Sequence, residues 1–341
     1  MAKLEDIKSE KDLPRDKNNA SHHYIPQFYL EGFSRNNKLA VWNRLDGSVR
    51  ISTPRNSACQ HGFNTIELAD GNKTSLYEDI FEKFETLAEP LIENMRCIFP
   101  CNPYGKQKYD ISNYMSLQEV RTPLHRKRVE MQADMLYKME LRKELSNRDK
   151  ILKFYRDGGT EPTEEQIQQT IDFVKNPHAV DILLNKGHVL QMSIESAFEI
   201  SKYFFLRNWT ILIFDKPSLI IGDAPILEIA DPEAGFLYGH GLAGAKELII
   251  PLSSTILLVM AKPKEYLNPL IMKGTYQVAE ITNRNQLENC LSEAYGDPEI
   301  LSRYKNFKLG PRKLMGFSNT AIDPNFLGHY NKPPKKQRPQ R

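Results

Sequence analysis

The sequence predicts an α+β protein in which N-terminal and C-terminal strands share an antiparallel sheet and a mainly helical middle lies between them. Changes in residue pattern along the 341 residues carry this prediction. Runs rich in β-branched and aromatic residues occur before residue 75 and again after residue 208, whereas apolar residues recur every three or four positions between 75 and 205. The resulting order of strands, helices, strands and a last helix is typical of an α+β fold.

The N-terminal part is predicted to be β-rich after a flexible leader at residues 1–20. Two short runs, 38–44 and 48–51, flank an Asp-Gly pair, and this pattern indicates a β-hairpin. Residues 62–68 predict one more short strand, which ends before Gly71. We therefore expect a small β-rich segment before residue 75.

A helical middle is predicted over residues 75–205. Ser75 and Glu78 have the spacing of a capping box at its start. Pro100 and Pro103 interrupt the apolar period. The helices predicted beyond this break span 111–144, 163–174 and 190–205.

Strands are predicted again after residue 208, because the helical spacing of apolar residues ends there. Residues 209–214 form an apolar run, and 218–223 is interpreted as its hairpin partner. The remaining predicted elements are strands at 248–251 and 255–260 and a closing helix at 283–295. We expect residues 21–300 to form a single domain and residues 301–341 to form a basic, partly disordered extension.

The charge distribution separates the C-terminal end from the rest of the chain. The whole sequence has a net charge of +3, but residues 300–341 hold ten Lys or Arg and one acid, a local balance of +9. A basic segment of this kind attracts phosphate groups, so it suggests a nucleic acid as partner. The alternative is a solvated, disordered tail.

Composition argues against several classes of protein. The longest apolar stretches fall short of the ~18 residues that identify a membrane span, and the N-terminus lacks the apolar core of a signal peptide. The cysteines at 59, 97, 101 and 290 are too few and scattered for a disulfide framework or a cysteine-based metal site. We expect a cytoplasmic protein without a membrane segment, and the sequence leaves the oligomeric state open.

The most unusual feature is the N-terminal motif SHHYIPQFYL at residues 21–30. Pro26 fixes its own φ and favours an extended conformation at Ile25, so His22 and His23 lie on a stiff segment and point to opposite sides of it. Imidazoles held in this way are candidates for catalysis or for binding a divalent metal. The alternative is a partly buried anchor whose ring nitrogens bond to the backbone.

Asp223 is the best acidic candidate, because it directly follows an apolar strand and so stands where a carboxylate can face a cleft. Together with His22 and His23 it would bind a divalent metal or move a proton. These three residues are the predicted catalytic and metal-binding set. The alternative for Asp223 is an Asx-turn that leads into Ala224-Pro225.

Four further residues are expected to bind substrate. Arg121 precedes a helix start expected at Thr122-Pro123, where free backbone N–H groups and a guanidinium suit phosphate. An exposed basic helix face explains Arg121 equally well. Arg207 is a second phosphate candidate, for which a structural arginine is the alternative, and Gln27 and Arg126 complete the predicted substrate-binding set.

These residues fall in blocks that resemble a mainly bacterial family, domain of unknown function 4238. The blocks are 22–30, 121–126, 207–225 and 251–253, followed by the amides Asn283, Gln286 and Asn289. The resemblance runs from about Ser21 to Tyr295, and the tail beyond about Ile300 lies outside it. The family pattern implies Thr-Ser-Asp before the proline, whereas Ile221-Gly222 precede Asp223 here. The resemblance supports the choice of residues and transfers no activity.

Two functions remain open from the sequence. The first is a phosphodiester hydrolase that acts on nucleic acid, RNA in the first place, as a toxin or defence effector. In it the histidines and Asp223 would do the chemistry, with or without metal, while the arginines hold phosphate. The second is a non-catalytic binding or interaction module, in which the same residues form a structural polar network.

Overall fold

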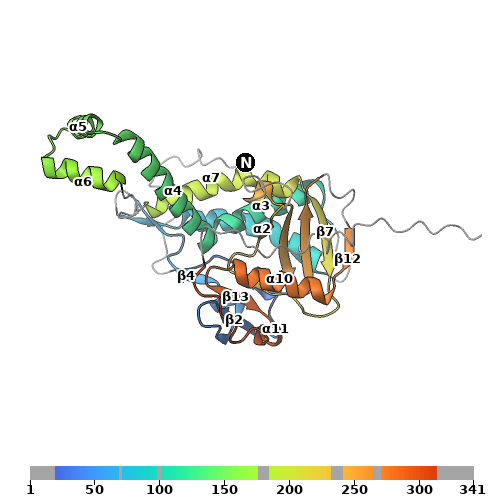
Figure 1. The fold of residues 1–341 in the computed structure, drawn as a ribbon. Coiled ribbons are helices and arrows are strands. Elements are labelled where there is room, and N and C mark those ends of the chain that lie inside the picture. The colour runs from blue at the N-terminus through green and yellow to red at the C-terminus, as the bar shows by residue number, and fades with distance from the viewer. Residues whose placement is uncertain are drawn as a thin grey trace, which may run out of the picture. The chain divides into compact units, whose positions relative to one another are not determined.

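The computed structural model describes residues 20–68, 71–97, 102–175, 184–231, 241–263 and 270–312 (Figure 1). They form two compact units. The first unit combines the chain up to His125 with the chain from Ser193, and the second is the inserted segment Arg126–Met192. Strands occur on both sides of a helical middle, which confirms the predicted α+β class.

The N-terminal half begins with short strands and continues with long helices. The elements are β1 (Ser21–His23), α1 (Gln27–Glu31), β2 (Leu39–Asn43), β3 (Val49–Ser52), the 3-10 turn η3 (Pro54–Asn56), β4 (Cys59–His61), β5 (Ile66–Glu67), β6 (Lys73–Thr74), α2 (Leu76–Arg96), α3 (Gly105–Val120) and α4 (Pro123–Glu144). Strands β2 and β3 pair antiparallel, which confirms the predicted hairpin. The strand predicted within 62–68 is β5, which pairs with β6.

The C-terminal half contains most of the long strands. Its elements are α5 (Arg148–Asp157), α6 (Glu164–Lys175), α7 (Lys186–Phe205), β7 (Asn208–Ile213), β8 (Ile221–Gly222), β9 (Leu227–Ile229), α9 (Gly241–Gly244), β10 (Glu247–Ser253), β11 (Ile256–Ala261), β12 (Leu270–Lys273), α10 (Tyr276–Asn289), β13 (Glu293–Gly296) and α11 (Pro298–Ser302). Strands β7, β10 and β11 occupy the positions that the sequence predicts.

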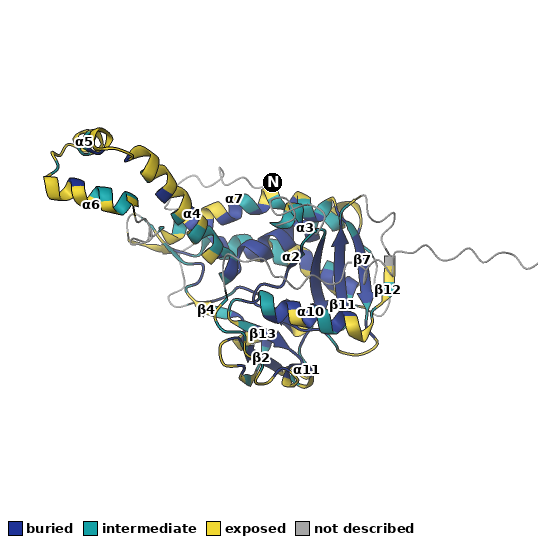
Figure 2. Ribbon diagram, viewed as in Figure 1, coloured by how far each residue is buried: buried dark blue, intermediate teal, exposed yellow. Residues whose placement is uncertain are grey.

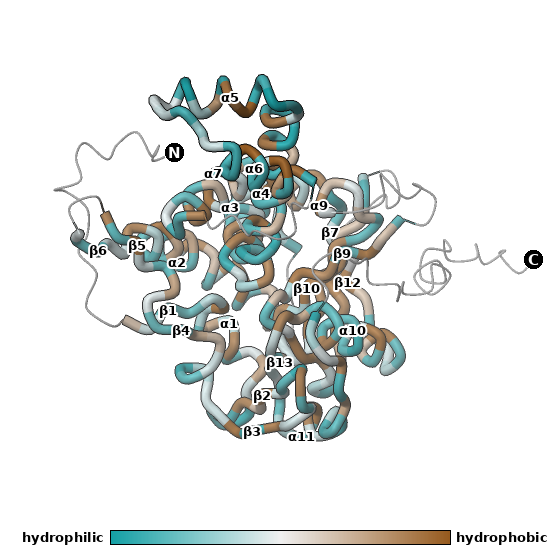
Figure 3. The backbone as a smooth tube through the Cα atoms, turned by 60° about the vertical axis from the view of Figure 1, so that its left-hand side comes forward, coloured by the Kyte–Doolittle hydropathy of each residue, from teal (hydrophilic) through white to brown (hydrophobic). Residues whose placement is uncertain are grey.

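A five-stranded sheet forms the main core of the first unit. Its order is β12-β7-β11-β10-β9, and the pairs are antiparallel except for β12, which runs parallel to β7. Every residue of β10 and β11 is buried (Figure 2), and much of the sheet is apolar (Figure 3). Helices α1 and α2 pack against β10. Strands that are covered on both faces read as continuous apolar runs, which is why these were predictable.

A second sheet of four strands joins the two ends of the chain. Its order is β3-β2-β13-β8, so the N-terminal hairpin pairs with strands from the C-terminal half, as predicted. A second apolar core belongs to this sheet and to α10 and α11, and it includes Trp42, Leu287 and Leu301. The two sheets belong to one unit, and β8 and β9 follow each other closely in the chain.

The interpretation of 218–223 as the hairpin partner of 209–214 is wrong. Strand β7 pairs with β11 and β12, whereas β8 pairs with β13. The physical reason is a row of amides on α10, which takes the backbone groups that a hairpin would use. Asn283 accepts from Ile220 N–H at 3.0 Å, and Gln286 accepts from Gly222 N–H at 2.8 Å. Asn289 donates to the carbonyls of Ala224 and Ile226.

Two helices begin at residues other than the predicted ones, because capping side chains fix their first turns. The run 111–144 is two helices, because α4 begins after Thr122, whose Oγ1 accepts the N–H of His125 at 3.1 Å. The closing helix begins at Tyr276, where Thr275 caps it, and it ends at Asn289. Residues 293–295, which were predicted to be the end of this helix, belong to β13 because β2 and β8 pair with that strand.

Two local predictions at helix starts also have clear outcomes. In the described part of the chain the Ser75 hydroxyl makes no capping bond to α2, and Glu78 instead accepts from the Asn64 side-chain amide. The predicted capping box is therefore not formed. Helix α5, which the sequence analysis did not predict, begins at a cap in which Asn147 accepts the N–H of Lys150 at 3.0 Å.

The inserted segment is helical and has a small core of its own. Leu145, Ile151 and Ile167 are buried together. Thr163 and Gln166 form a reciprocal capping box at the start of α6, with N–H donors at 2.8 and 3.2 Å. Much of the surface of α5 and α6 is exposed (Figure 2). The segment therefore relies on few apolar contacts within itself.

The packed chain of the first unit continues past residue 300. Leu301 and Tyr304 are buried, and Arg312 donates to the carbonyl of Glu288 at 2.6 Å. The predicted leader at 1–19, Cys101 and the basic tail from residue 313 lie outside the described residues. Among the helices that are described, none is long and apolar enough to cross a membrane.

Replacing Gly222 by alanine is expected to destabilise the first unit by ~1–3 kcal/mol. An added Cβ would lie 2.8 Å from the carbonyl oxygen of Gln286 on α10 and 2.8 Å from Cβ of Cys290, the residue that follows α10. Overpacking of this kind costs more than the ~0.4–1 kcal/mol that alanine gains from the unfolded chain. Urea unfolding followed by circular dichroism measures the change. Gly158→Ala is the control, because its nearest neighbour would lie at 3.4 Å; equal stability of the two variants would contradict the expected close approach.

Candidate functional site

The histidine pair lies on a two-stranded ribbon made of β1 and β4. His22 is buried and His23 is half-buried, as expected when alternate residues of a strand face opposite sides. The His22 Nδ1 accepts the backbone N–H of Asn64 at 2.9 Å and lies 3.9 Å from Oε1 of Glu78. His22 therefore serves as an acceptor that ties β1 to the loop after β4.

His23 has a defined role for one ring nitrogen. Its Nε2 lies 3.0 Å from the carbonyl oxygen of Arg55, so Nε2 carries the proton and Nδ1 carries the lone pair. Burial lowers the pKa of His23, and the hydrogen bond to Arg55 opposes this change. The charges that act on the ring come from Arg121, Glu78 and Glu85. His23 is thus a neutral imidazole at neutral pH, with a basic nitrogen beside an ionic group.

The carbonyl of Tyr24 connects the histidine segment to α3. It accepts from Nε2 of Gln118 at 2.8 Å and from Nε of Arg121 at 3.1 Å. Arg121 also forms a buried ion pair with Glu85 of α2, and its guanidinium lies 5.0 Å from the centre of the Phe81 ring. The residue after the histidine pair is therefore held by two side chains at once.

Three buried polar atoms on this side of α3 have no hydrogen-bond partner among the described residues. They are the Tyr114 hydroxyl, Gln118 Oε1 and Arg121 Nη2, and each residue is at most 3% exposed. Their spacing of four and three residues places them on one face of the helix turn. An unpaired buried polar group costs ~1–3 kcal/mol. These three atoms therefore lower the stability of the fold as it stands.

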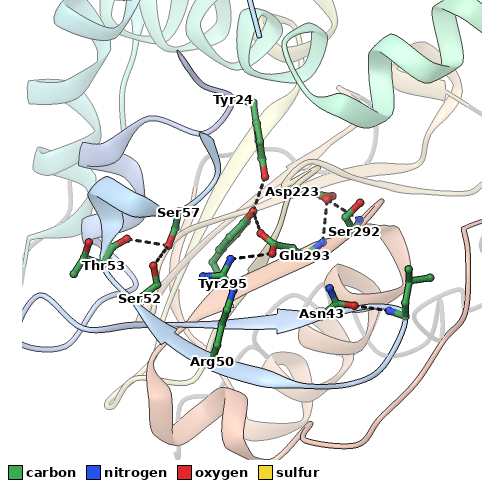
Figure 4. A network of polar contacts seen from close by, with 11 residues as sticks. Tyr24, Asn43, Arg50, Ser52, Thr53, Ser57, Asp223, Ser292, Glu293 and Tyr295 are labelled. Carbon is green, nitrogen blue, oxygen red and sulfur yellow. Dashed lines mark hydrogen bonds and ion pairs between the residues drawn. The ribbon is translucent and has the colours of Figure 1, made fainter. Parts of the chain in front are cut away.

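A second polar chain runs from the side chain of Tyr24 to Asp223 (Figure 4). The Tyr24 and Tyr295 hydroxyls lie 2.8 Å apart, and Tyr295 donates to Oε2 of Glu293 at 3.0 Å. Tyr24 is accordingly the donor to Tyr295. The other oxygen of Glu293 pairs with Arg50 at 3.0 Å. This chain joins β1 to β13 and β3 in the four-stranded sheet.

Asp223 is saturated by backbone donors. Its carboxylate accepts the N–H groups of Leu291, Ser292 and Glu293 at 2.6, 2.7 and 3.1 Å, and its own N–H donates to the Glu293 carbonyl at 2.9 Å. Burial raises the pKa of Asp223 from 3.8 to about 6, and the three N–H donors oppose that rise. The side chain closes the loop between α10 and β13.

Arg207 is part of a different group of contacts. Its Nη1 donates to the carbonyls of Lys246 and Met260, and its Nη2 donates to those of Leu242 and Ala245, at 2.7–3.3 Å. The residue is 4% exposed. These bonds place Arg207 at the end of α9 and at β10 and β11, so its guanidinium already has four acceptors.

The remaining two predicted residues differ in their surroundings. Gln27 is exposed at the start of α1, and its side chain donates to Glu31 at 2.9 Å. Arg126 is buried and belongs to the inserted segment. Gln27 therefore lies close to the histidine segment in sequence, while its hydrogen bond stays within its own helix.

The structure thus joins some of the predicted site residues by contacts. Arg121 donates to the carbonyl of Tyr24, the residue after the histidine pair, and its charge acts on the His23 ring. Asp223 connects to the side chain of Tyr24 through Glu293 and Tyr295. Among the described residues, no three His, Cys, Asp or Glu side chains are placed to hold a metal ion together. His22 and Asp223, two of the three predicted metal ligands, accept hydrogen bonds from backbone N–H groups instead.

Comparison with known families identifies the family of this chain. A family model described as "Protein of unknown function (DUF4238)" matches residues 21–299 of the chain. The chain belongs to this family. No curated protein and no solved structure matches it. The DUF4238 match begins at β1 and includes both partners of the Tyr24–Tyr295 contact, so the polar chain lies entirely within the family region.

Several residues of this DUF4238 site were not predicted from its sequence. Glu78 and Glu85 on α2 surround the histidine segment, and Gln118, Glu293 and Tyr295 complete the two polar groups. The seven-residue spacing of Glu78 and Glu85 places them on one side of α2 and was the only available signal. The role of Tyr295 was missed because the sequence predicted this residue to lie in a helix.

The free energy of unfolding is expected to fall by ~3 kcal/mol between about pH 4 and about pH 6 through Asp223 alone. Its pKa is raised by folding, so its contribution is fully present below 3.8 and is lost as the pH passes about 6. Asp223→Asn cannot titrate and should lack this component. Urea titrations at a series of pH values, followed by tryptophan fluorescence, give the difference. If the free energy of unfolding changed equally with pH in both proteins, the three N–H donors would cancel the effect of burial on the pKa of Asp223.

Proposed function

We propose that the chain is a non-catalytic binding or interaction module of the cytoplasm, in which the histidine, arginine and aspartate residues form a structural polar network. The observation that carries this proposal is the saturation of Asp223 by three backbone N–H groups. Three of the about four acceptor positions of this carboxylate are used to close the loop, which favours a structural role. Free thiols at Cys59, Cys97 and Cys290 agree with a reducing compartment.

The arginine contacts support the same proposal. Arg207 gives four hydrogen bonds to backbone carbonyls and so has little capacity left for phosphate. His22 uses Nδ1 to accept a backbone N–H. Both side chains supply hydrogen-bond partners to backbone groups that lack a backbone partner, and this role is structural.

Removing the Asp223 carboxylate should therefore lower the free energy of unfolding. We expect Asp223→Ala to lower the free energy of unfolding by ~3 kcal/mol or more, because three buried N–H groups lose their acceptor. Gln27→Ala is the matched control and should stay within ~0.5 kcal/mol, since Gln27 is exposed and bonds only to its own helix. Tryptophan fluorescence in urea measures both. A folded Asp223→Ala protein of unchanged stability would contradict the proposal.

A phosphodiester hydrolase acting on RNA, as a toxin or defence effector, is the second candidate. One set of observations favours it: Nδ1 is the basic nitrogen of the His23 ring, the charge of Arg121 acts on this ring, and Arg121 Nη2 has no partner among the described residues. In such an enzyme His23 would take the proton from the attacking oxygen and Arg121 would hold the phosphate. Neither role needs Asp223 or Arg207.

Incubating the purified chain with RNA and with DNA, with and without Mg²⁺, separates the two candidates. The hydrolase candidate predicts cleavage that His23→Ala lowers about 100-fold or more, the usual contribution of a general base. His188→Ala is the control, because His188 is exposed in the inserted segment. Absence of cleavage by the wild-type chain, or equal cleavage by His23→Ala, removes this candidate and leaves the binding module.

A further inference from the structure

Helix α4 exposes more large apolar side chains than any other helix of the described chain. Met135, Leu136 and Met139 are 44%, 61% and 60% exposed. The core of the inserted segment, as far as the structure describes it, is built around Leu145 and Ile151 and includes none of these three. Clustered large apolar side chains that no core covers indicate a binding surface.

These side chains form one stripe along the helix. Positions three and four apart share a side of a helix, so Met131, Met135 and Met139 form a row and Leu136 stands beside it. We call these four residues the Met-Leu stripe. Tyr137 is 47% exposed but lies on the opposite side, because it is two positions, or about 200° of rotation, from Met135 and from Met139.

The charges of α4 are sorted around the Met-Leu stripe. Arg128 precedes the stripe on the same side of the helix, and Arg142 and Lys143 follow it. The four acids of the helix, at positions 130, 134, 140 and 144, lie toward the opposite side. Lys143 pairs with Glu140 at 3.5 Å, an exposed contact that contributes little. The surface is therefore apolar in the middle and basic at both ends.

This charge pattern distinguishes three kinds of occupant. A second copy of α4 would bring Arg128 against Arg128 in a parallel pair and against Arg142 in an antiparallel pair, so like charges disfavour it. Helices that lie in a membrane surface carry Lys and Arg on their polar face, whereas the polar face of α4 holds its four acids. A partner with acidic ends meets a base at each end of the stripe.

We propose that the Met-Leu stripe docks an amphipathic helix of another protein, with apolar residues in its middle and acidic residues at both ends. Rows of residues four apart form ridges and grooves into which a second helix packs. Methionine side chains are unbranched and flexible, so they fit apolar surfaces of different shapes. From Arg128 to Lys143 the face is about 22 Å long, which corresponds to about four helical turns. The inference rests on the proposed interaction function and names its surface and its partner.

Selection from a display library of random peptides tests the chemistry of the partner. The library holds peptides of about 20 residues, long enough for such a helix, and the bait is the full chain. Peptides that also bind the double variant Leu136→Gln/Met139→Gln are removed. We expect the remaining peptides to carry apolar residues at helical spacing between acidic ends. Enrichment of basic or uncharged peptides, or of none, overturns the inference.

The affinity of one enriched peptide is then measured by fluorescence anisotropy. Arg142→Glu/Lys143→Glu should weaken it about tenfold or more, and Tyr137→Gln, the matched control on the opposite side, should keep it. Raising NaCl from about 0.05 to about 0.5 M should weaken it too, because exposed charges are screened. All these variants should melt within a few degrees of the wild-type chain, since their side chains are exposed.

Three results overturn the inference in this second experiment. They are an unchanged affinity of Arg142→Glu/Lys143→Glu, self-association of the chain that Leu136→Gln/Met139→Gln abolishes, and binding to phosphatidylserine vesicles that the same variant abolishes. Sedimentation equilibrium and vesicle flotation measure the last two. The proposed function fails separately, if Asp223→Ala keeps its stability or the chain cleaves RNA.

Discussion

The first unit depends on side chains that pair with backbone groups which no neighbouring strand or helix turn can reach. Three arginines donate hydrogen bonds to backbone carbonyls at the ends of helices: Arg44 at α10, Arg96 at α1 and Arg207 at α9. The carboxylate of Asp223 accepts hydrogen bonds from the N–H groups after α10. Buried backbone groups without partners would cost more than the fold can tolerate, so these few side chains allow short elements to pack closely.

The same constraint explains how the histidine motif is held. The Tyr24 carbonyl receives two side-chain donors, Gln118 Nε2 and Arg121 Nε, instead of a strand partner. The Tyr24 hydroxyl then extends the connection to Tyr295 and Glu293 in the other sheet (Figure 4). The histidines are thus one part of a junction between the N-terminal ribbon, two helices and the four-stranded sheet.

Residue patterns predict the fold well where burial repeats along the chain. The apolar runs at β7, β10 and β11 and the period of α2 follow from continuous burial, and the Asp-Gly turn follows from its geometry. The sharing of a sheet by the two ends was predicted, but the individual strand partners were not. The amides of α10 bond to the segment that was expected to pair with β7, and Tyr295 is a strand residue because β2 and β8 flank it. The candidate site residues were chosen from local motifs, whereas the contacts of Asp223 and Arg207 are made with loops that have no periodic signal.

The pairing of β2 with β13 has a consequence for synthesis of the chain. About 250 residues separate the two strands, so at ~5–20 residues per second β2 waits on the order of 10–50 s for its partner to leave the ribosome. During that time Trp42 and the neighbouring apolar residues of β2 form an open strand edge. The nascent chain is therefore exposed to wrong pairing or chaperone capture while the residues between β2 and β13 are made, and the four-stranded sheet closes only after β13 has been synthesised.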